Sequence, residues 1–182
     1  MVKRIVLLVL PIVLLAMPLA AQDYAALELG FGYANWGAAN TPTTTARTSG
    51  FAMHTNYNLT SWFGIDNYLG LYSFPDAGGI TDWTAYYNVF GVKLTARDVL
   101  DGKISPFVVA GFGGGSISSN NIGGGFGSAA ARFGGGVDFN LSDGIAFRVD
   151  ASNLAIGNTI FDDSWQGNLN VATSIIFNMG GF

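Results

Sequence analysis

The chain has 182 residues, enough for one domain and a targeting segment. Its formal net charge is −4 and it has no cysteine, which excludes a small disulfide-stapled fold and argues against nucleic acid as a partner. Charged residues are only 11% of the chain, whereas roughly 25% is usual in soluble domains. This deficit is a first indication of contact with lipid.

The N-terminus has the pattern of an export signal. Lys3 and Arg4 precede an apolar run from Ile5 to Ala16, and small residues follow at 18–21. The run is shorter than the about 20 residues that a membrane-spanning helix needs. We therefore expect a signal peptide over residues 1–21 and a mature domain over residues 22–182, with an uncleaved N-terminal anchor as the alternative.

The mature chain reads as strands throughout, because apolar and polar residues alternate with period two and helical periodicity is absent. About eight strands are expected, near residues 24–34, 50–57, 62–74, 84–94, 104–112, 129–141, 145–151 and 168–179. The inward and outward faces of the segment 104–112 cannot be assigned from its sequence.

A hairpin over residues 129–151 shows the alternation most clearly. Phe133 and Val149 lie on its apolar face, whereas Arg132 and Asp150 lie on its polar face. The pattern does not say which face is inside. A soluble sandwich turns the apolar face inward, and a membrane barrel turns it toward lipid.

The connections between strands alternate in length. Those predicted to be long lie near residues 36–48, 75–83, 113–127 and 155–167, and those predicted to be short near 58–61, 97–103 and 142–144. The glycine triplets of the 113–127 segment lack the lysine and the following helix of a phosphate-binding loop, so we interpret them as flexible surface loop. An up-and-down barrel has its odd and even connections at opposite ends, and outer-membrane barrels have short periplasmic turns and longer outer loops.

The tryptophans favour the same interpretation. Trp36, Trp83 and Trp165 fall near the predicted long connections, and Trp62 falls beside a short one. Because tryptophan settles at membrane–water interfaces, we expect these four to form an aromatic girdle around the barrel.

Residues 22–182 resemble the small bacterial outer-membrane β-barrels of the OmpA/OmpX type. The resemblance rests on the export signal, the alternating strands, the connection lengths and the terminal Phe182, and the segments 50–62 and 105–115 share it. It implies an all-β, eight-stranded antiparallel up-and-down transmembrane barrel in the outer membrane, preceded by a signal peptide. Outer-membrane lipid and the barrel assembly machinery are the partners it implies.

The C-terminus departs from the family pattern, in which a final aromatic residue on the outward face resembles the assembly signal. Gly180 and Gly181 place Phe182 off the parity of Phe177 and Met179. Either the last strand ends at Met179 with a short tail, or a bulge resets the register.

The inward candidates form a mixed set of charges: Glu28, His54, Asp66, Lys93, Arg132, Asp138, Arg148 and Asp150. Eight strands leave an interior just filled by side chains, where charges must be paired. We therefore expect a buried ion-pair network, no catalytic residue, no cofactor and no metal. His54 and Thr55 point to opposite sides of a strand, which argues against a local catalytic dyad, and a partner for His54 on another strand stays open as an alternative.

These observations predict a non-enzymatic outer-membrane barrel with a structural or surface-interaction role through four long extracellular loops, where a ligand would bind. Two alternatives stay open: an exported soluble barrel that binds a small hydrophobic ligand, as lipocalins do, and a narrow porin-like channel. A barrel enzyme that acts on lipid through His54 is a third.

Overall fold

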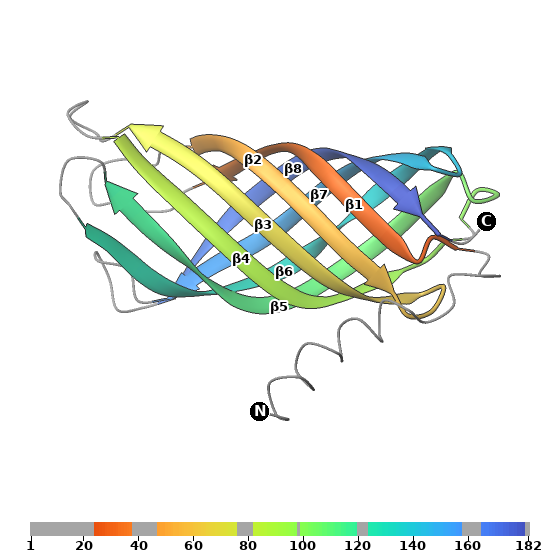
Figure 1. Ribbon diagram of the computed structural model, residues 1–182, viewed down its shortest axis with the longest axis horizontal. Helices are drawn as coiled ribbons and strands as arrows, with labels where there is room; N and C mark the ends of the chain where they lie inside the picture. Colours follow the sequence, from red (N-terminus) through yellow and green to blue (C-terminus); the bar gives the residue numbers. More distant parts are fainter. Residues whose placement is uncertain are drawn as a thin grey trace, which may run out of the picture.

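The eight strands of the chain close into one antiparallel barrel. The computed structural model describes residues 24–37, 47–75, 82–97, 99–119, 124–157 and 165–180. Each strand pairs with the next along the chain and the last pairs with the first, so the predicted fold class is confirmed (Figure 1). The strands are β1 (Leu27–Gly37), β2 (Arg47–Asn58), β3 (Phe63–Pro75), β4 (Asp82–Thr95), β5 (Ile104–Ser119), β6 (Gly124–Ser142), β7 (Ile145–Gly157) and β8 (Gln166–Met179).

Closure occurs where β1 meets β8. Leu27 lies opposite Met179 and Trp36 lies opposite Asn170, so β1 pairs with β8 along nearly its whole length. The backbone N–H of Ala26 donates to the carbonyl of Gly180 (2.7 Å) beyond the end of the ladder. Each of the eight described strands therefore has a hydrogen-bonded neighbour on both sides, which is the condition for a sheet that crosses a membrane.

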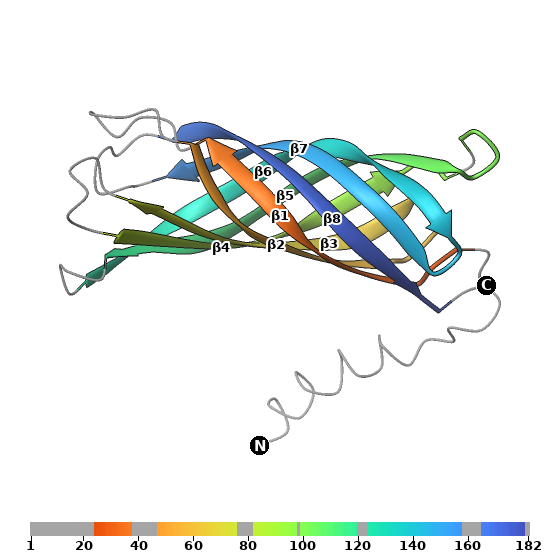
Figure 2. The same cartoon turned by 90° about the horizontal axis from the view of Figure 1, so that it is seen from above.

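The two ends of the barrel differ, and we name them by what lies there. The turn end contains the connections β2–β3, β4–β5 and β6–β7, together with the start of β1 and the end of β8; the opposite end, where the remaining connections begin, is the loop end (Figures 1 and 2). At the turn end β8 stops at Met179, and Gly180 adopts a positive φ of 68°. Of the two alternatives for the C-terminus, the strand end at Met179 is therefore the one observed, and Phe182 lies outside the described residues.

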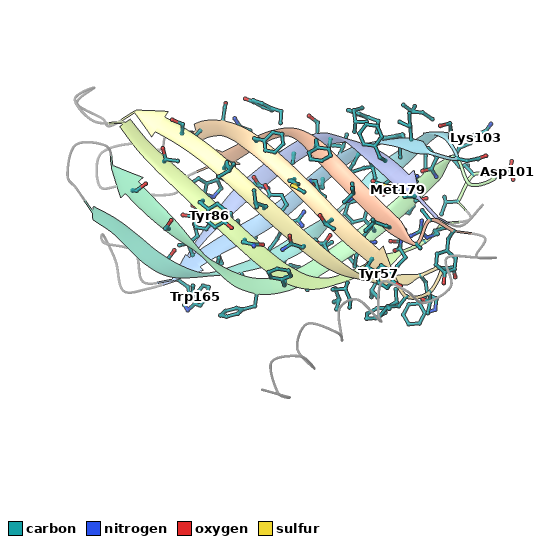
Figure 3. All side chains as sticks on the ribbon, viewed as in Figure 1. Tyr57, Tyr86, Asp101, Lys103, Trp165 and Met179 are labelled. Carbon is teal, nitrogen blue, oxygen red and sulfur yellow. The ribbon has the colours of Figure 1, made fainter. Side chains whose placement is uncertain are left out.

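Apolar residues cover the outside of the barrel and polar residues fill the inside. On β6, Phe133 is 71% exposed whereas its neighbour Arg132 is 3% exposed. The same alternation runs along β7, from Ile145 outward and Ala146 inward to Ser152 inward. Figure 3 shows side chains projecting from both faces of the ribbons. A lipocalin has the opposite arrangement, so the soluble ligand-binding alternative is wrong.

The glycine-rich stretch near the middle of the chain is strand and not loop. β5 continues to Ser119 and β6 begins at Gly124, so most of the predicted loop 113–127 belongs to the sheet. The reason is close packing: a Cβ atom at Gly115 would meet the ring of Tyr87, which lies inside the barrel. Glycine here makes room for a neighbouring aromatic ring. The prediction of a loop was wrong because it treated the abundance of glycine as a sign of flexible chain.

The predicted alternation of long and short connections is therefore only partly right. By the strand bounds, the sequence between β1 and β2, β3 and β4, β5 and β6, and β7 and β8 covers residues 38–46, 76–81, 120–123 and 158–165. The three turn-end connections cover residues 59–62, 96–103 and 143–144. Only residues 120–123 separate β5 from β6, so the prediction of four long loops is wrong. The part of the chain that the structure describes contains no helix long and apolar enough to span a membrane.

Replacing Gly134 with valine should destabilise the barrel by about 1–3 kcal/mol, because overpacking forces neighbouring groups to move. A Cβ at Gly134 would lie 2.6 Å from Cβ of Ser152 on β7. Equilibrium unfolding in urea measures the loss. Gly144→Ala is the control, since nothing lies within 4 Å of its added Cβ; equal loss in both variants would contradict the packing explanation.

Candidate functional site: a charged network inside the barrel

All eight charged or titratable residues predicted to face inward lie inside the barrel and are buried. They are Glu28 on β1, His54 on β2, Asp66 on β3, Lys93 on β4, Arg132 and Asp138 on β6, and Arg148 and Asp150 on β7. Period-two alternation places each of them, since every second side chain of a barrel strand points to the interior. The structure sorts them into two clusters at different depths.

The turn-end cluster consists of Glu28, Lys93, Arg97, Asp138 and Arg148. Nζ of Lys93 lies 2.6 Å from Oε2 of Glu28 and 3.3 Å from Oδ2 of Asp138. Arg148 donates from Nε to Oδ1 of Asp138 (2.6 Å) and from Nη2 to both Oδ2 of Asp138 (2.7 Å) and Oε2 of Glu28 (2.8 Å). These bonds connect β1, β4, β6 and β7 across the lumen.

Arg97 completes this cluster and was not predicted from the sequence. It follows β4, and its Nη2 donates to Oε1 of Glu28 (3.0 Å) while its Nε donates to the carbonyl of Ser61 (2.7 Å). Asn58 also donates to Oε1 of Glu28 (2.9 Å). Arg97 was assigned to a polar turn, where no periodicity indicates an inward direction.

The mid-barrel cluster consists of His54, Asp66, Arg132 and Asp150. Arg132 joins the two carboxylates, with Nη1 3.2 Å from Oδ2 of Asp66 and Nη2 2.8 Å from Oδ1 of Asp150. Its Nε donates to Oγ of Ser152 (3.2 Å). Nε2 of His54 lies 3.6 Å from Oδ2 of Asp150. His54 therefore meets a carboxylate of another strand, the alternative that the sequence left open.

Aromatic rings lie against the buried cations. Phe107 is within 4.7 Å of Nζ of Lys93 and 4.6 Å of Cζ of Arg148, measured to its ring centroid. Tyr68 lies 4.3 Å below the guanidinium of Arg132. Such contacts stabilise cations that are removed from water. Tyr68 lies two residues from Asp66 on the same strand, so the alternation predicted that both point inward. Phe107 lies in the segment 104–112, whose faces the sequence left unassigned.

Toward the loop end the interior becomes aromatic and apolar. The hydroxyl of Tyr72 donates to Oδ1 of Asn170 (2.8 Å) and hydrogen-bonds to the hydroxyl of Tyr68 (2.6 Å). The ring of Trp36 lies 5.3 Å from that of Tyr72 and 5.4 Å from that of Tyr87. Small inward residues make room for these rings: Ala34, Ala52, Ala85, Ala130 and Ala172.

Trp36 is therefore not part of an exterior girdle, which corrects the prediction. It is 3% exposed, because it shares the parity of Glu28 and points inward. Its place near a strand end suggested an interface residue, and the alternation within β1 decides the question instead. Trp62 and Trp165 are exposed on the outside, at the turn end and the loop end respectively. The side chain of Trp83 lies outside the described residues.

The chemistry of the network is charge compensation. Glu28, Asp66, Asp138 and Asp150 face Lys93, Arg97, Arg132 and Arg148, so the charges of the described interior balance. Within the described residues, no group of three histidine, aspartate or glutamate side chains is placed to hold a metal ion. His54 and Asp150 are both about 1% exposed, so their pair has no access to a substrate from outside.

Comparison with known proteins gives a consistent result. A family model described as outer membrane protein beta-barrel domain matches residues 6–177. No curated protein matches the sequence. Among solved structures, Neisserial surface protein A has a TM-score of 0.61 at 12% identity, covering 87% of this chain and 99% of its own.

Two further structures show the same fold. The N-terminal β-barrel domain of Pseudomonas aeruginosa OprF has a TM-score of 0.56 at 14% identity, covering 86% of this chain and 99% of its own. Ail, the attachment invasion locus protein of Yersinia pestis, has a TM-score of 0.51 at 16% identity, covering 85% of this chain and 99% of its own. These identities are low, so the similarity is one of fold.

Proposed function

Because the chain belongs to the family of outer membrane protein beta-barrel domains, we propose that it is a non-enzymatic barrel whose interior is closed by paired charges. It lies in the bacterial outer membrane, where its apolar exterior meets lipid. Its role is structural, and it holds the loop-end connections at the outer surface of the cell. Interaction with an extracellular partner would take place there.

The observation that supports a closed interior is the turn-end cluster. Arg148, from β7, contacts both Glu28 on β1 and Asp138 on β6, so one side chain reaches across the lumen. Arg148 is among the largest fully buried side chains of the described residues. A solute would have to break several charge-assisted hydrogen bonds to pass, and these are stronger in a medium of low dielectric constant.

Further support comes from the exterior tryptophans. Trp62 and Trp165 lie at opposite ends of the wall, at positions where aromatic residues of membrane barrels meet the two interfaces. The turn end then faces the periplasm and the loop end faces outward. Removal of residues 1–21 as a signal peptide and recognition by the barrel assembly machinery belong to the same proposal.

Reconstitution in planar lipid bilayers tests the closed interior. We expect no steady conductance steps from the folded protein, because the ion pairs of the turn-end cluster join β1, β4, β6 and β7 across the lumen. A large porin in the same bilayers is the positive control, and the folded state is checked by its heat-dependent mobility on a gel. Steady pores from folded protein would contradict the proposal and favour the narrow-channel alternative.

A further inference from the structure

Two asparagines lie on the outside of the barrel, within the apolar wall. Asn67 on β3 and Asn88 on β4 share the outward parity of their strands, and both are partly exposed. Toward the turn end they are followed by the exposed pair Ile65 and Val92, and toward the loop end by the exposed pair Leu71 and Tyr86. The asparagines are thus placed at the depth of lipid tails and not at an interface.

The two amides bind each other but use only part of their capacity. Nδ2 of Asn67 donates to Oδ1 of Asn88 (2.5 Å) and to the carbonyl of Val89 (3.3 Å). Oδ1 of Asn67 and Nδ2 of Asn88 have no hydrogen-bond partner among the described residues. An amide contributes two acceptor sites and two donor hydrogens, and leaving them unpaired in hydrocarbon is costly.

The wall beside Asn88 has an uneven shape. Gly114 on β5 lies next to Asn88, and Ala129 on β6 lies next to Gly114, so the wall beside Asn88 has little side-chain bulk. The ring of Trp165 borders these small residues, 6.2 Å from the ring of Phe112. Directly toward the turn end, Phe90 and Phe112 face each other across β4 and β5, at 59% and 62% exposure. We call the surface formed by Asn67, Asn88, Phe90, Phe112, Gly114 and Ala129 the β3–β6 patch. β3 and β4 cross the near side of the barrel in Figure 1.

We propose that the β3–β6 patch binds a second copy of this chain in the membrane. The unused acceptor of Asn67 and the unused donor of Asn88 lie side by side on one surface, so a two-fold axis places each donor against the acceptor of the other copy. Phe90 of one copy then packs against the small residue Gly114 of the other. Lipid tails offer neither donor nor acceptor, and small residues with polar groups are what associates membrane segments.

Cysteine cross-linking tests the interface directly, because the natural chain has no cysteine. Ser116→Cys on β5 and Leu69→Cys on β3 place a thiol beside the patch, because Ser116 pairs with Tyr86 and Leu69 pairs with Asn88. Each variant is oxidised in phosphatidylcholine vesicles at a low protein-to-lipid ratio. We expect a covalent dimer from both. Thr173→Cys, near the middle of β8 and outside the patch, is the matched control and should stay monomeric.

A second measurement separates association from folding. The double variant Asn67→Leu, Asn88→Leu should dimerise about tenfold more weakly in vesicles, as read by energy transfer between labelled copies on dilution with lipid. Its heat-dependent mobility should match that of the unchanged protein. Equal cross-linking at Thr173→Cys, unchanged association of the double variant, or monomers at every lipid ratio would overturn the proposal, and the last result would mean that lipid alone covers the patch.

Discussion

Replacing Arg148 with methionine should lower the free energy of unfolding by about 3–5 kcal/mol, the largest loss that we expect from one substitution in this barrel. Arg148 is buried and makes three hydrogen bonds to Glu28 and Asp138. Methionine has similar length but no charge. Its introduction leaves two carboxylates in a medium of low dielectric constant with only Lys93 and Arg97 to compensate them.

Equilibrium unfolding in urea, with the barrel refolded into phospholipid vesicles, measures this loss. Arg97→Met is a graded comparison: its side chain is 20% exposed, so water compensates part of the missing charge and the loss should be smaller. Lys103→Met, at an exposed turn position, is the control that should change little. If Arg148→Met and Lys103→Met unfolded at the same urea concentration, the network would not stabilise the fold.

Replacing Phe31 with arginine should cost about 2–4 kcal/mol, the range for a cation that faces lipid near the bilayer midplane of a barrel. Phe31 lies near the middle of β1, opposite Met53 on β2 and Ile175 on β8. Its ring lies 6.3 Å from that of Phe51. An arginine at this position would lose the apolar contacts of Phe31, and its guanidinium would have to extend along the outer wall to reach water at the interface.

The same unfolding experiment distinguishes lipid from water outside the barrel. Leu141→Arg is the matched control, because Leu141 is equally outward but close to the turn end, where the expected cost is about 0–1 kcal/mol. A wall in contact with water would tolerate both substitutions within about 0.5 kcal/mol. Equal and small losses at the two positions would therefore contradict a membrane-facing exterior.

Sequence reasoning identified the charged interior residues because two rules act on the same positions. Alternation places Arg132, Asp138, Arg148 and Asp150 on one face, and the cost of a lone buried charge requires that opposite charges accompany one another. Neither rule gives the partners. The contact between Arg148 and Glu28 joins residues 120 apart in the chain, and only closure of β1 against β8 brings them together.

The errors came from reading a residue type without its parity or its neighbours. Trp36 was assigned to an interface because it lies near a strand end, although its inward parity sends it against Tyr72 and Tyr87. Glycines 113–115 were read as loop, although they pair with β4 and β6 throughout. A glycine that makes room for the ring of its partner on the neighbouring strand looks the same in sequence as one in a flexible loop.

The sequence by itself determined the strands, their two faces and the need for an exterior that meets lipid, because period-two alternation and low charge are local or compositional properties. The tertiary structure decided which charges pair, where the lumen changes from ionic to aromatic, and that Asn67 and Asn88 share a site on the outer wall. Those features depend on register and closure. Both are set when separate strands meet, and no single strand carries that information.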